Sequence, residues 1–309
     1  MPMKIGTELY RKTLLTVSGN PLVEKLTLRY GKSLARKFIA ASDLEGALEE
    51  VKKLNDKGIM ATLDHLGEGI TRLDQAAAYR NEYIRLIKAI TESRVDANVS
   101  LKPTQMGLAL NKEICYEHIR AVVREAKYRR NFVRIDMEDS PYTDATLEIV
   151  WKLHKEQLTN VGTVIQAYLF RTEQDVGDCM QQGIPLRLVK GAYKEPSSIA
   201  YQNGKDVLWQ YKRIIQMHLD HNVYTAIASH DDKIIRWTKQ YALEHDVPKD
   251  RFEFQMLYGL RMQEQAKLAE EGYRVRCYVP YGTMWYPYYT RRLAEKPANL
   301  MMVLKNMGR

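Results

Sequence analysis

Residues 273–295 read Tyr-Arg-Val-Arg-Cys-Tyr-Val-Pro-Tyr-Gly-Thr-Met-Trp-Tyr-Pro-Tyr-Tyr-Thr-Arg-Arg-Leu-Ala-Glu. The β-type run 273–279 stops at Pro280 and Gly282, two residue types that interrupt regular structure. Pro287 then suits the first turn of a helix, where its missing N–H leaves no hydrogen bond unmade. The stretch therefore predicts a strand, a tight loop and a helix, in that order.

The same alternation of short β-type runs and helical segments extends back along the chain. Segments 144–157 and 206–219, for example, have helical periodicity. The predicted strands are 59–63, 97–101, 132–135, 161–165, 184–189, 223–228, 252–256 and 273–277. Eight strands alternating with helices are typical of a closed (β/α)8 TIM-type barrel, an α/β fold.

The chain shows no linker that would divide it. It has 309 residues, of which 45% are hydrophobic, and it contains no low-complexity tract. We therefore predict one domain over 1–309, with a mainly helical N-terminal segment, 1–57, before the barrel, 58–309. In that first segment the Ser42-x-x-Glu45 pattern predicts a capped helix start, and Gly58 is expected to end the helix.

Composition narrows the class of protein. Three widely spaced cysteines, Cys115, Cys179 and Cys277, argue against a disulfide framework or a zinc site and favour a reducing cytoplasm. No apolar run is long enough for a transmembrane helix, and no secretory signal is expected. Lys and Arg number 47 against 38 Asp and Glu, a formal charge of +9. Such an excess is compatible with nucleic acid, an anionic membrane or anionic substrates.

Polar residues gather where the predicted strands end. A barrel strand covered on both faces is expected to be nearly all apolar. Polar side chains nevertheless stand at or just past the strand ends, namely Lys102, Asp136, Gln166, Lys190, His230 and Tyr278. Because the carboxyl ends of barrel strands converge on one rim, where the βα loops build the active site, this set predicts a functional site there.

The last predicted helix carries a second signal. Tyr288, Arg291, Arg292 and Glu295 fall at i, i+3, i+4 and i+7 and share one face. Two adjacent guanidinium groups suit a carboxylate or phosphate bound through paired hydrogen bonds. The plain alternative is a solvated, salt-bridged surface helix. The aromatic residues crowded into 278–289 favour the anion site.

The chemistry that fits this rim is the binding of anions. Its cations are Lys102, Arg187, Lys190, Arg291 and Arg292, and its acceptors are Asp136, Glu68 and Glu295. The chain lacks a metal-binding motif, a nucleophile elbow and a Rossmann glycine fingerprint. A cationic rim lined with tyrosines suggests a small carboxylate substrate beside an anionic aromatic cofactor, and FAD fits this description. Arg187 or Lys190 would then stabilise negative charge on the reduced flavin.

These residues lie within motifs that resemble the proline dehydrogenase family. In chain order the motifs are Phe132-Val-Arg-Ile-Asp136-Met137-Glu138-Asp139, Arg187-Leu-Val-Lys190-Gly191-Ala192-Tyr193, Ala228-Ser229-His230-Asp231, Phe254-Gln255-Met256-Leu257-Tyr258-Gly259, Tyr278-Val-Pro-Tyr-Gly282 and Tyr288-Tyr-Thr-Arg291-Arg292-Leu-Ala-Glu295. The resemblance covers about 58–299. It implies a distorted, FAD-binding (β/α)8 barrel that oxidises L-proline to Δ1-pyrroline-5-carboxylate, the first step of proline catabolism to glutamate. It also implies that electrons pass to a membrane quinone.

The resemblance also implies roles for individual residues. Arg291, Arg292 and Lys102 would hold the proline carboxylate, and Asp136 would order these cations. Tyr278, Tyr288 and Leu257 would enclose the ring. Arg187 would lie at the flavin N5 edge and form a gate ion pair with Glu68. The contacts to FAD would come from Met137, Gln166, Arg187, Lys190, Gly191, Ala192, Tyr193, Ser229 and His230, with Gln255 and Glu295 as further candidates.

Two departures from the family pattern bear on these expectations. Ser229 stands where the family often has threonine, and the hydroxyl is kept. The chain ends at Arg309, without the aldehyde dehydrogenase module of bifunctional relatives. We therefore expect the short monofunctional bacterial branch, which needs a separate pyrroline-5-carboxylate dehydrogenase. Peripheral contact with the inner face of the cell membrane is expected, and a nucleic-acid partner is not.

Two other functions stay open at this point. A Schiff-base aldolase on the same barrel would use Lys102 or Lys190 as the nucleophile. A non-catalytic basic module would bind nucleic acid or a membrane and would show affinity that depends steeply on salt.

Overall fold

The computed structural model describes residues 37–67, 69–221 and 223–295, and the single positions 16, 20 and 25. The predicted helical segment before residue 37 otherwise lies outside the described residues. The strands are β1 (Met60–His65), β2 (Ala97–Leu101), β3 (Val133–Ile135), β4 (Val161–Gln166), β5 (Leu186–Val189), β6 (Thr225–Ala228), β7 (Phe252–Leu257) and β8 (Arg274–Tyr281). The helices are α4 (Leu44–Asn55), α5 (Leu73–Ser93), α6 (Lys112–Tyr128), α7 (Thr143–Lys155), α8 (Thr172–Gln181), α9 (Gly204–Asp220), α10 (Asp232–Glu244), α11 (Met262–Glu270) and α12 (Tyr286–Glu295), with 3-10 turns η1 (Pro103–Met106) and η2 (Ser140–Tyr142).

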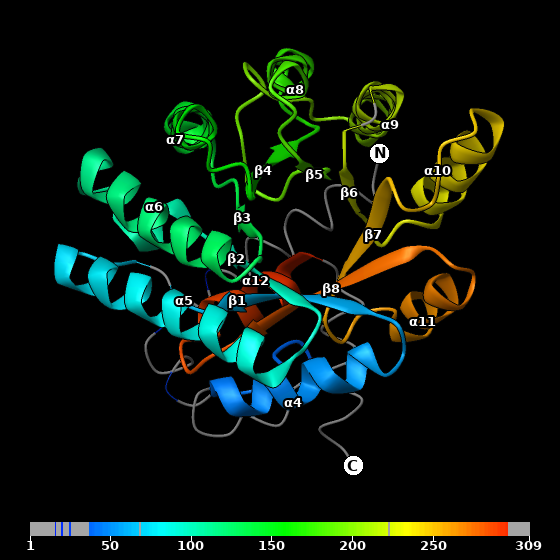
Figure 1. Cartoon of the computed structure of the whole chain (residues 1–309). Helices are drawn as coiled ribbons and strands as arrows, with labels where there is room; N and C mark the ends of the chain where they lie inside the picture. Colours follow the sequence, from blue (N-terminus) through cyan, green and yellow to red (C-terminus); the bar gives the residue numbers. More distant parts are fainter. Residues whose placement is uncertain are drawn as a thin grey trace.

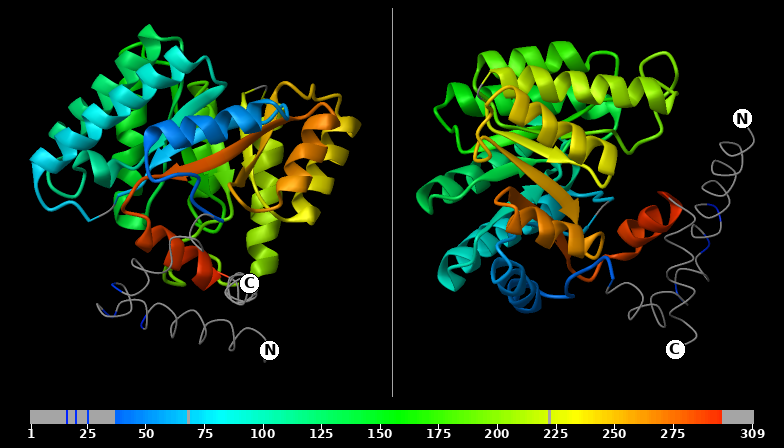
Figure 2. Two further views of the ribbon diagram at one scale, coloured as in Figure 1. Left: turned by 90° about the horizontal axis from the view of Figure 1, so that it is seen from below. Right: turned by 90° about the vertical axis from the view of Figure 1, so that its right-hand side faces the viewer.

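The strands close into a parallel barrel in chain order, β1 to β8, with β8 paired to β1. Helices α4 to α11 surround the barrel, as Figure 1 shows in a view along its axis. Helix α12 is placed differently. It lies across one mouth of the barrel, below the strands in the left view of Figure 2. Because α12 follows β8, the mouth that it covers is the one where the strands end.

All the predicted strands are confirmed, with ends that shift by a few residues. The largest correction concerns β8, which continues through Pro280 to Tyr281 instead of stopping at Cys277. Strand β7 ends opposite Tyr278, so beyond it β8 has one neighbouring strand, β1, and Pro280 pairs there with Asp64. On its other side the Pro280 carbonyl accepts a hydrogen bond from the Ala40 N–H at 3.0 Å, and a residue without an N–H is tolerated at such an edge. Tyr278 therefore lies inside the last strand and not at its end.

The start of α4 also differs from the prediction. Asp43, not Ser42, is the N-cap, and its side chain accepts a hydrogen bond from the Gly46 N–H at 2.9 Å. The capping box expected from Ser42 is therefore not formed. Helix α4 ends at Asn55, and Gly58 lies in the following turn with φ of +70°, a conformation that suits glycine.

The inside of the barrel is polar, which corrects the expectation of nearly apolar strands. Along β3, Val133 and Ile135 pack in the apolar core under the helices, whereas Arg134 between them donates hydrogen bonds to the carbonyls of Thr163 and Pro185. Arg134 is only 3% exposed. Polar groups survive burial when partners satisfy them, so these strands have one apolar and one hydrogen-bonded face.

Among the helices that the structure describes, none is both long enough and apolar enough to span a bilayer.

Candidate active site

Asp136 connects two of the predicted site residues at the mouth of the barrel. Its carboxylate accepts hydrogen bonds from the Arg187 guanidinium at 2.6 Å and from the Tyr278 hydroxyl at 2.9 Å. The Lys102 ammonium lies farther away, at 4.0 Å. Among the hydrogen-bonded contacts that the structure describes, Asp136 is thus tied most closely to Arg187 and Tyr278.

Arg187 extends this network across the barrel. Its Nε donates to Gln255 Oε1 at 2.6 Å and its Nη2 to Ser100 Oγ at 2.9 Å. The guanidinium also lies over the Tyr278 ring, 5.2 Å from the centroid. Because its partners come from β2, β7 and β8 as well as from the end of β3, Arg187 is held in one orientation.

Asp64 is a site residue that sequence reasoning missed. It is fully buried at the end of β1, and its Oδ2 accepts a hydrogen bond from Lys102 Nζ at 2.9 Å. The Tyr83 hydroxyl lies 3.3 Å from the other oxygen. Lys102 Nζ is also 3.5 Å from the Tyr278 hydroxyl, so Asp64 and Asp136 flank one lysine. The signal in the sequence was an acidic residue at the carboxyl end of a predicted strand, the same criterion that selected Asp136.

The predicted anion helix is formed and is close to this network. In α12 the Arg292 guanidinium stacks over the Tyr288 ring at 5.2 Å, and both arginines are partly buried. Arg291 is near enough to Tyr193 for its charge to counteract part of the rise in that phenol's pKa, as Lys102 does. The structure therefore brings Arg291, Lys102 and Tyr193 into one electrostatic neighbourhood.

Burial keeps the two site phenols protonated. It raises the pKa of Tyr278 well above its ordinary value, and the charges of Asp136 and Asp64 raise it further. Burial likewise raises the pKa of Tyr193, with Glu138 adding to the effect. Tyr278 is therefore a hydrogen-bond donor to Asp136 at physiological pH.

The remaining predicted residues line the ends of β4 to β7. Gln166 Nε2 donates to the Glu138 carbonyl at 2.9 Å, and its Oε1 faces the Ala192 N–H at 3.5 Å. Gly191 has φ of +112°, and a Cβ there would lie 2.3 Å from the Tyr168 ring, so only glycine fits.

Three further contacts fix this side of the rim. Lys190 pairs with Asp231 at 2.7 Å, and the Ser229 hydroxyl accepts from the Asp231 N–H at 3.1 Å. His230 Nε2 accepts from the Leu257 N–H at 3.0 Å. Met137 is buried beside the barrel core. The loops after β5, β6 and β7 are thus held together by the side chains that the motifs contain.

Two predicted residues cannot be placed. Glu68, the expected gate, lies outside the described residues. The backbone of Glu295 is the last residue of α12, but its side chain also lies outside the described part of the chain.

A lower polar layer continues the network toward the other mouth. Gln255 Nε2 donates to Glu253, which is 2% exposed and also accepts from Arg276 Nε at 2.9 Å and from the Tyr224 hydroxyl at 2.7 Å. Arg276 in turn donates to the Ala61 carbonyl at 2.8 Å. Glu253 and Arg276 were also missed, although each alternates with apolar residues along its strand.

The donors at this mouth fit FAD. A flavin dinucleotide needs cations for its pyrophosphate and donors along the ring edge, and the mouth offers Arg187, Lys190, Gln166, Ser229 and His230 on neighbouring strand ends. The bond from the Leu257 N–H orients the His230 ring. These residues are pre-positioned by contacts within the protein, as a cofactor site requires.

Comparison with known proteins identifies the family. Residues 47–304 match the family model described as proline dehydrogenase. The chain is 43% identical to proline dehydrogenase 1 of Bacillus subtilis strain 168 over 298 residues, which are 96% of this chain and 98% of that protein. This chain belongs to the proline dehydrogenase family. It is also 39% identical to the proline dehydrogenase of Deinococcus radiodurans over 304 residues, 97% of this chain and 98% of that one.

Longer proteins contain a region similar to this chain. The bifunctional protein PutA of Escherichia coli K12 is 25% identical over 330 residues, 93% of this chain but 25% of that protein. The crystal structure of proline utilization A from Bdellovibrio bacteriovorus, inactivated by N-propargylglycine, superposes with a TM-score of 0.80 at 26% identity and covers 88% of this chain. This chain spans about a third, 33%, of that solved chain.

The lysines do not have the surroundings that an aldolase requires. A Schiff-base nucleophile must present a neutral amine to its substrate. Lys102 is instead paired with Asp64, and Lys190 with Asp231. Both lysines are therefore arranged as charged groups that bind anions, and not as nucleophiles.

Proposed function

We propose that this protein oxidises L-proline to Δ1-pyrroline-5-carboxylate with FAD and passes the electrons to a membrane quinone. The observation that carries the proposal is the hydrogen-bonded set Lys102, Asp136, Arg187 and Tyr278 beneath α12, in a chain of the proline dehydrogenase family. A bound FAD would accept the hydride that leaves C5 of proline.

The cations position the substrate. Arg291, Arg292 and Lys102 are proposed to bind the proline carboxylate, and this contact would fix the position of the small ring. Fixing a reactant in the orientation of attack can contribute on the order of 7–11 kcal/mol to lowering a barrier. Asp64 and Asp136 support this task by neutralising Lys102 and Arg187 when no substrate is present.

The aromatic residues shape the rest of the pocket. Tyr278, Tyr288 and Leu257 are proposed to enclose the ring, and α12 is proposed to exclude water from that mouth of the barrel. Tyr278 is no base for the substrate amine, because its raised pKa keeps the phenol protonated and its proton is directed at Asp136. Water is the proposed acceptor of the amine proton.

The cofactor is proposed to rest on the ends of β4 to β7. Arg187 would face the flavin N5 edge and, with Glu68, would gate the site. The other proposed contacts are Met137, Gln166, Lys190, Gly191, Ala192, Tyr193, Ser229, His230, Gln255 and Glu295.

The product defines a further proposed partner. The chain matches monofunctional relatives over nearly their whole length, 98% in Bacillus subtilis. We propose that a separate pyrroline-5-carboxylate dehydrogenase consumes the product and that the quinone is reached by peripheral contact with the membrane.

Proline-dependent reduction of a soluble quinone analogue tests the proposal, with N-propargylglycine as the probe of the site. The expected result is turnover that N-propargylglycine abolishes progressively and that excess L-proline protects. A protein that gives no reduction with proline, but whose lysine is trapped as an adduct by borohydride, would be an aldolase and not a dehydrogenase.

A further inference from the structure

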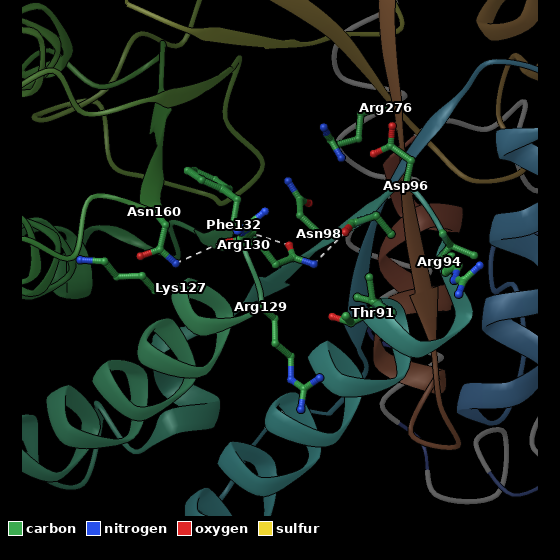
Figure 3. Close-up of a pocket in the computed structure, with 14 residues that line it drawn as sticks. Thr91, Arg94, Asp96, Asn98, Lys127, Arg129, Arg130, Phe132, Asn160 and Arg276 are labelled. Atoms are coloured by element: carbon green, nitrogen blue, oxygen red, sulfur yellow. Dashed lines mark hydrogen bonds between the residues drawn. The ribbon is translucent and has the colours of Figure 1, made fainter.

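A cavity of about 600 Å³ opens at the mouth of the barrel where the strands begin, opposite the candidate active site (Figure 3). Its walls come from the last turns of α5 and α6, and its floor from the beginnings of β2 and β3 and from β8. Asn98 belongs to this floor, on the strand that carries Ser100 and ends just before Lys102. The cavity is thus the far end of the polar barrel interior.

The cavity is lined by an excess of positive charge. Its cations are Arg94, Lys127, Arg129, Arg130 and Arg276, against one acidic residue, Asp96. Arg129 pairs with Glu125 at 2.6 Å and Arg276 with Glu253 at 2.9 Å. The guanidinium groups of Arg94 and Arg130 form no hydrogen bond or ion pair with any residue that the structure describes. Two arginines at the opening are therefore available to an anion.

The backbone at these two arginines is left-handed, as it also is at Gln157, Asp246 and Arg261 among the described residues. Arg94 and Arg130 both have φ of 54°, in the left-handed region, one at the end of α5 and one just past the end of α6. Glycine or asparagine adopts this conformation with less strain. Cations near helix C-termini do offset the helix dipole, but lysine or arginine in the preceding helical turn would do so without strain.

The floor offers unused acceptors. The Asn98 and Asn160 Oδ1 atoms are buried, and neither has a hydrogen-bond partner within the described part of the chain. The Asn160 amide cannot simply be turned, because its Nδ2 already donates to the carbonyls of Val123 and Asn131 at 3.1 Å. Figure 3 shows Asn98 between Arg130 and Arg94, and Asn160 on the other side of Arg130, near Lys127. Both oxygens are closed to solvent, but the Asn98 amide makes no other hydrogen bond with the described residues, so turning it would present its oxygen to a ligand that carries hydroxyl groups.

We propose that this cavity binds a small soluble phosphate ester that carries free hydroxyl groups. Arg94 and Arg130 would hold the phosphate, and Asn98 would accept from a hydroxyl. Bidentate guanidinium groups suit phosphate oxygens, and the volume is that of a ligand pocket. The site is separate from the proline site and does not depend on its assignment.

Isothermal titration with ribose 5-phosphate at low salt tests the proposal. The wild-type protein should bind it saturably, and Arg94→Gln/Arg130→Gln should weaken binding by at least about tenfold. The matched control is Arg124→Gln/Arg236→Gln, which removes the same charge from exposed positions that do not line the cavity. The control should bind as tightly as the wild type.

Asn98→Leu changes no charge and should also weaken binding, with thermal unfolding confirming that the variant is folded. Saturating L-proline should leave the affinity for ribose 5-phosphate unchanged. The proposal is overturned by an absence of saturable binding at millimolar concentrations, by equal weakening in both double variants, or by displacement of the probe by proline.

Discussion

Replacing Asp136 by asparagine removes one charge from the centre of the site and keeps the shape of the side chain. The carboxylate holds Arg187 at 2.6 Å and Tyr278 at 2.9 Å, with Lys102 at 4.0 Å. The side chains of Asp136 and Arg187 are only 14% and 6% exposed. Asp136→Asn therefore leaves a buried guanidinium without its carboxylate, while Lys102 keeps Asp64.

The size of the effect follows from this burial. Removing one partner of a buried ion pair costs about 3–5 kcal/mol of stability. For a chain of this length that corresponds to a fall in Tm of roughly 5–8 °C. Arg187 and Tyr278 also lose their common anchor, and a displacement of about 1 Å in a catalytic group can cost about 100-fold. We expect kcat/KM for proline to fall by about that factor, mainly through kcat.

The assay combines steady-state kinetics, FAD content and thermal unfolding. Asp175→Asn is the matched control, because Asp175 pairs with Arg171 at 2.8 Å on α8, outside the barrel. The control should keep full kcat. If Asp136→Asn kept kcat/KM within about twofold of wild type with FAD bound, against the about 100-fold loss expected from misplacement, the reasoning would be refuted.

Four further outcomes are expected. Arg291→Met or Arg292→Met should raise KM for proline with FAD still bound, because each variant loses a charge-assisted bond worth about 1.5–3 kcal/mol. A near-normal KM in both variants would mean that other residues bind the carboxylate. Tyr278→Ser should shift the ratio of kcat/KM toward 4-hydroxyproline, by roughly tenfold to two-hundredfold if shape alone discriminates, and an unchanged ratio would remove Tyr278 from the ring pocket. Burial lowers the pKa of His218 from its ordinary 6.5 to about 3, so only the unfolded state takes up a proton between those values. The free energy of unfolding should then fall by up to about 1.4 kcal/mol per pH unit as pH drops from about 6.5 toward 3, and His218→Gln should reduce that slope; an unchanged slope in urea titrations would contradict it. At low salt, more protein should float with anionic vesicles than with neutral ones, and at high salt the two amounts should be equal. Equal recovery in all conditions would mean that net charge does not guide docking to the membrane.

The barrel could be predicted from the sequence because its strands are short β-type runs with one apolar face, and they alternate with helical segments. The run 97–101 is β2 without a shift, whereas β8 extends past Pro280 because its pairing with β1 outlasts its pairing with β7. That extension depends on a partner strand about 215 residues away in the chain, which local patterns do not contain. The existence of each strand could thus be predicted from the sequence, but the point at which β8 ends could not.

The rim residues could be predicted, but their pairing could not. Asp136 was expected to order Lys102, Arg291 and Arg292; the structure places Lys102 at 4.0 Å and adds shorter hydrogen bonds to Arg187 and Tyr278. Which inward side chains meet across a barrel depends on register and tilt.

The alternation of apolar and polar residues along the strands also predicts the polar interior of the barrel. In Phe252-Glu-Phe-Gln-Met, the phenylalanines pack outward in the apolar core, and Glu253 and Gln255 join the polar interior. Because the strands were expected to be nearly apolar, this pattern was not interpreted as a polar barrel interior.

The visible absorption spectrum of the purified protein, before and after anaerobic addition of L-proline, tests the central claim most directly. We expect an oxidised flavin spectrum that bleaches when proline is added and returns when a soluble quinone is supplied. A protein that can be loaded with FAD but whose flavin spectrum does not change with proline would contradict the proposed function.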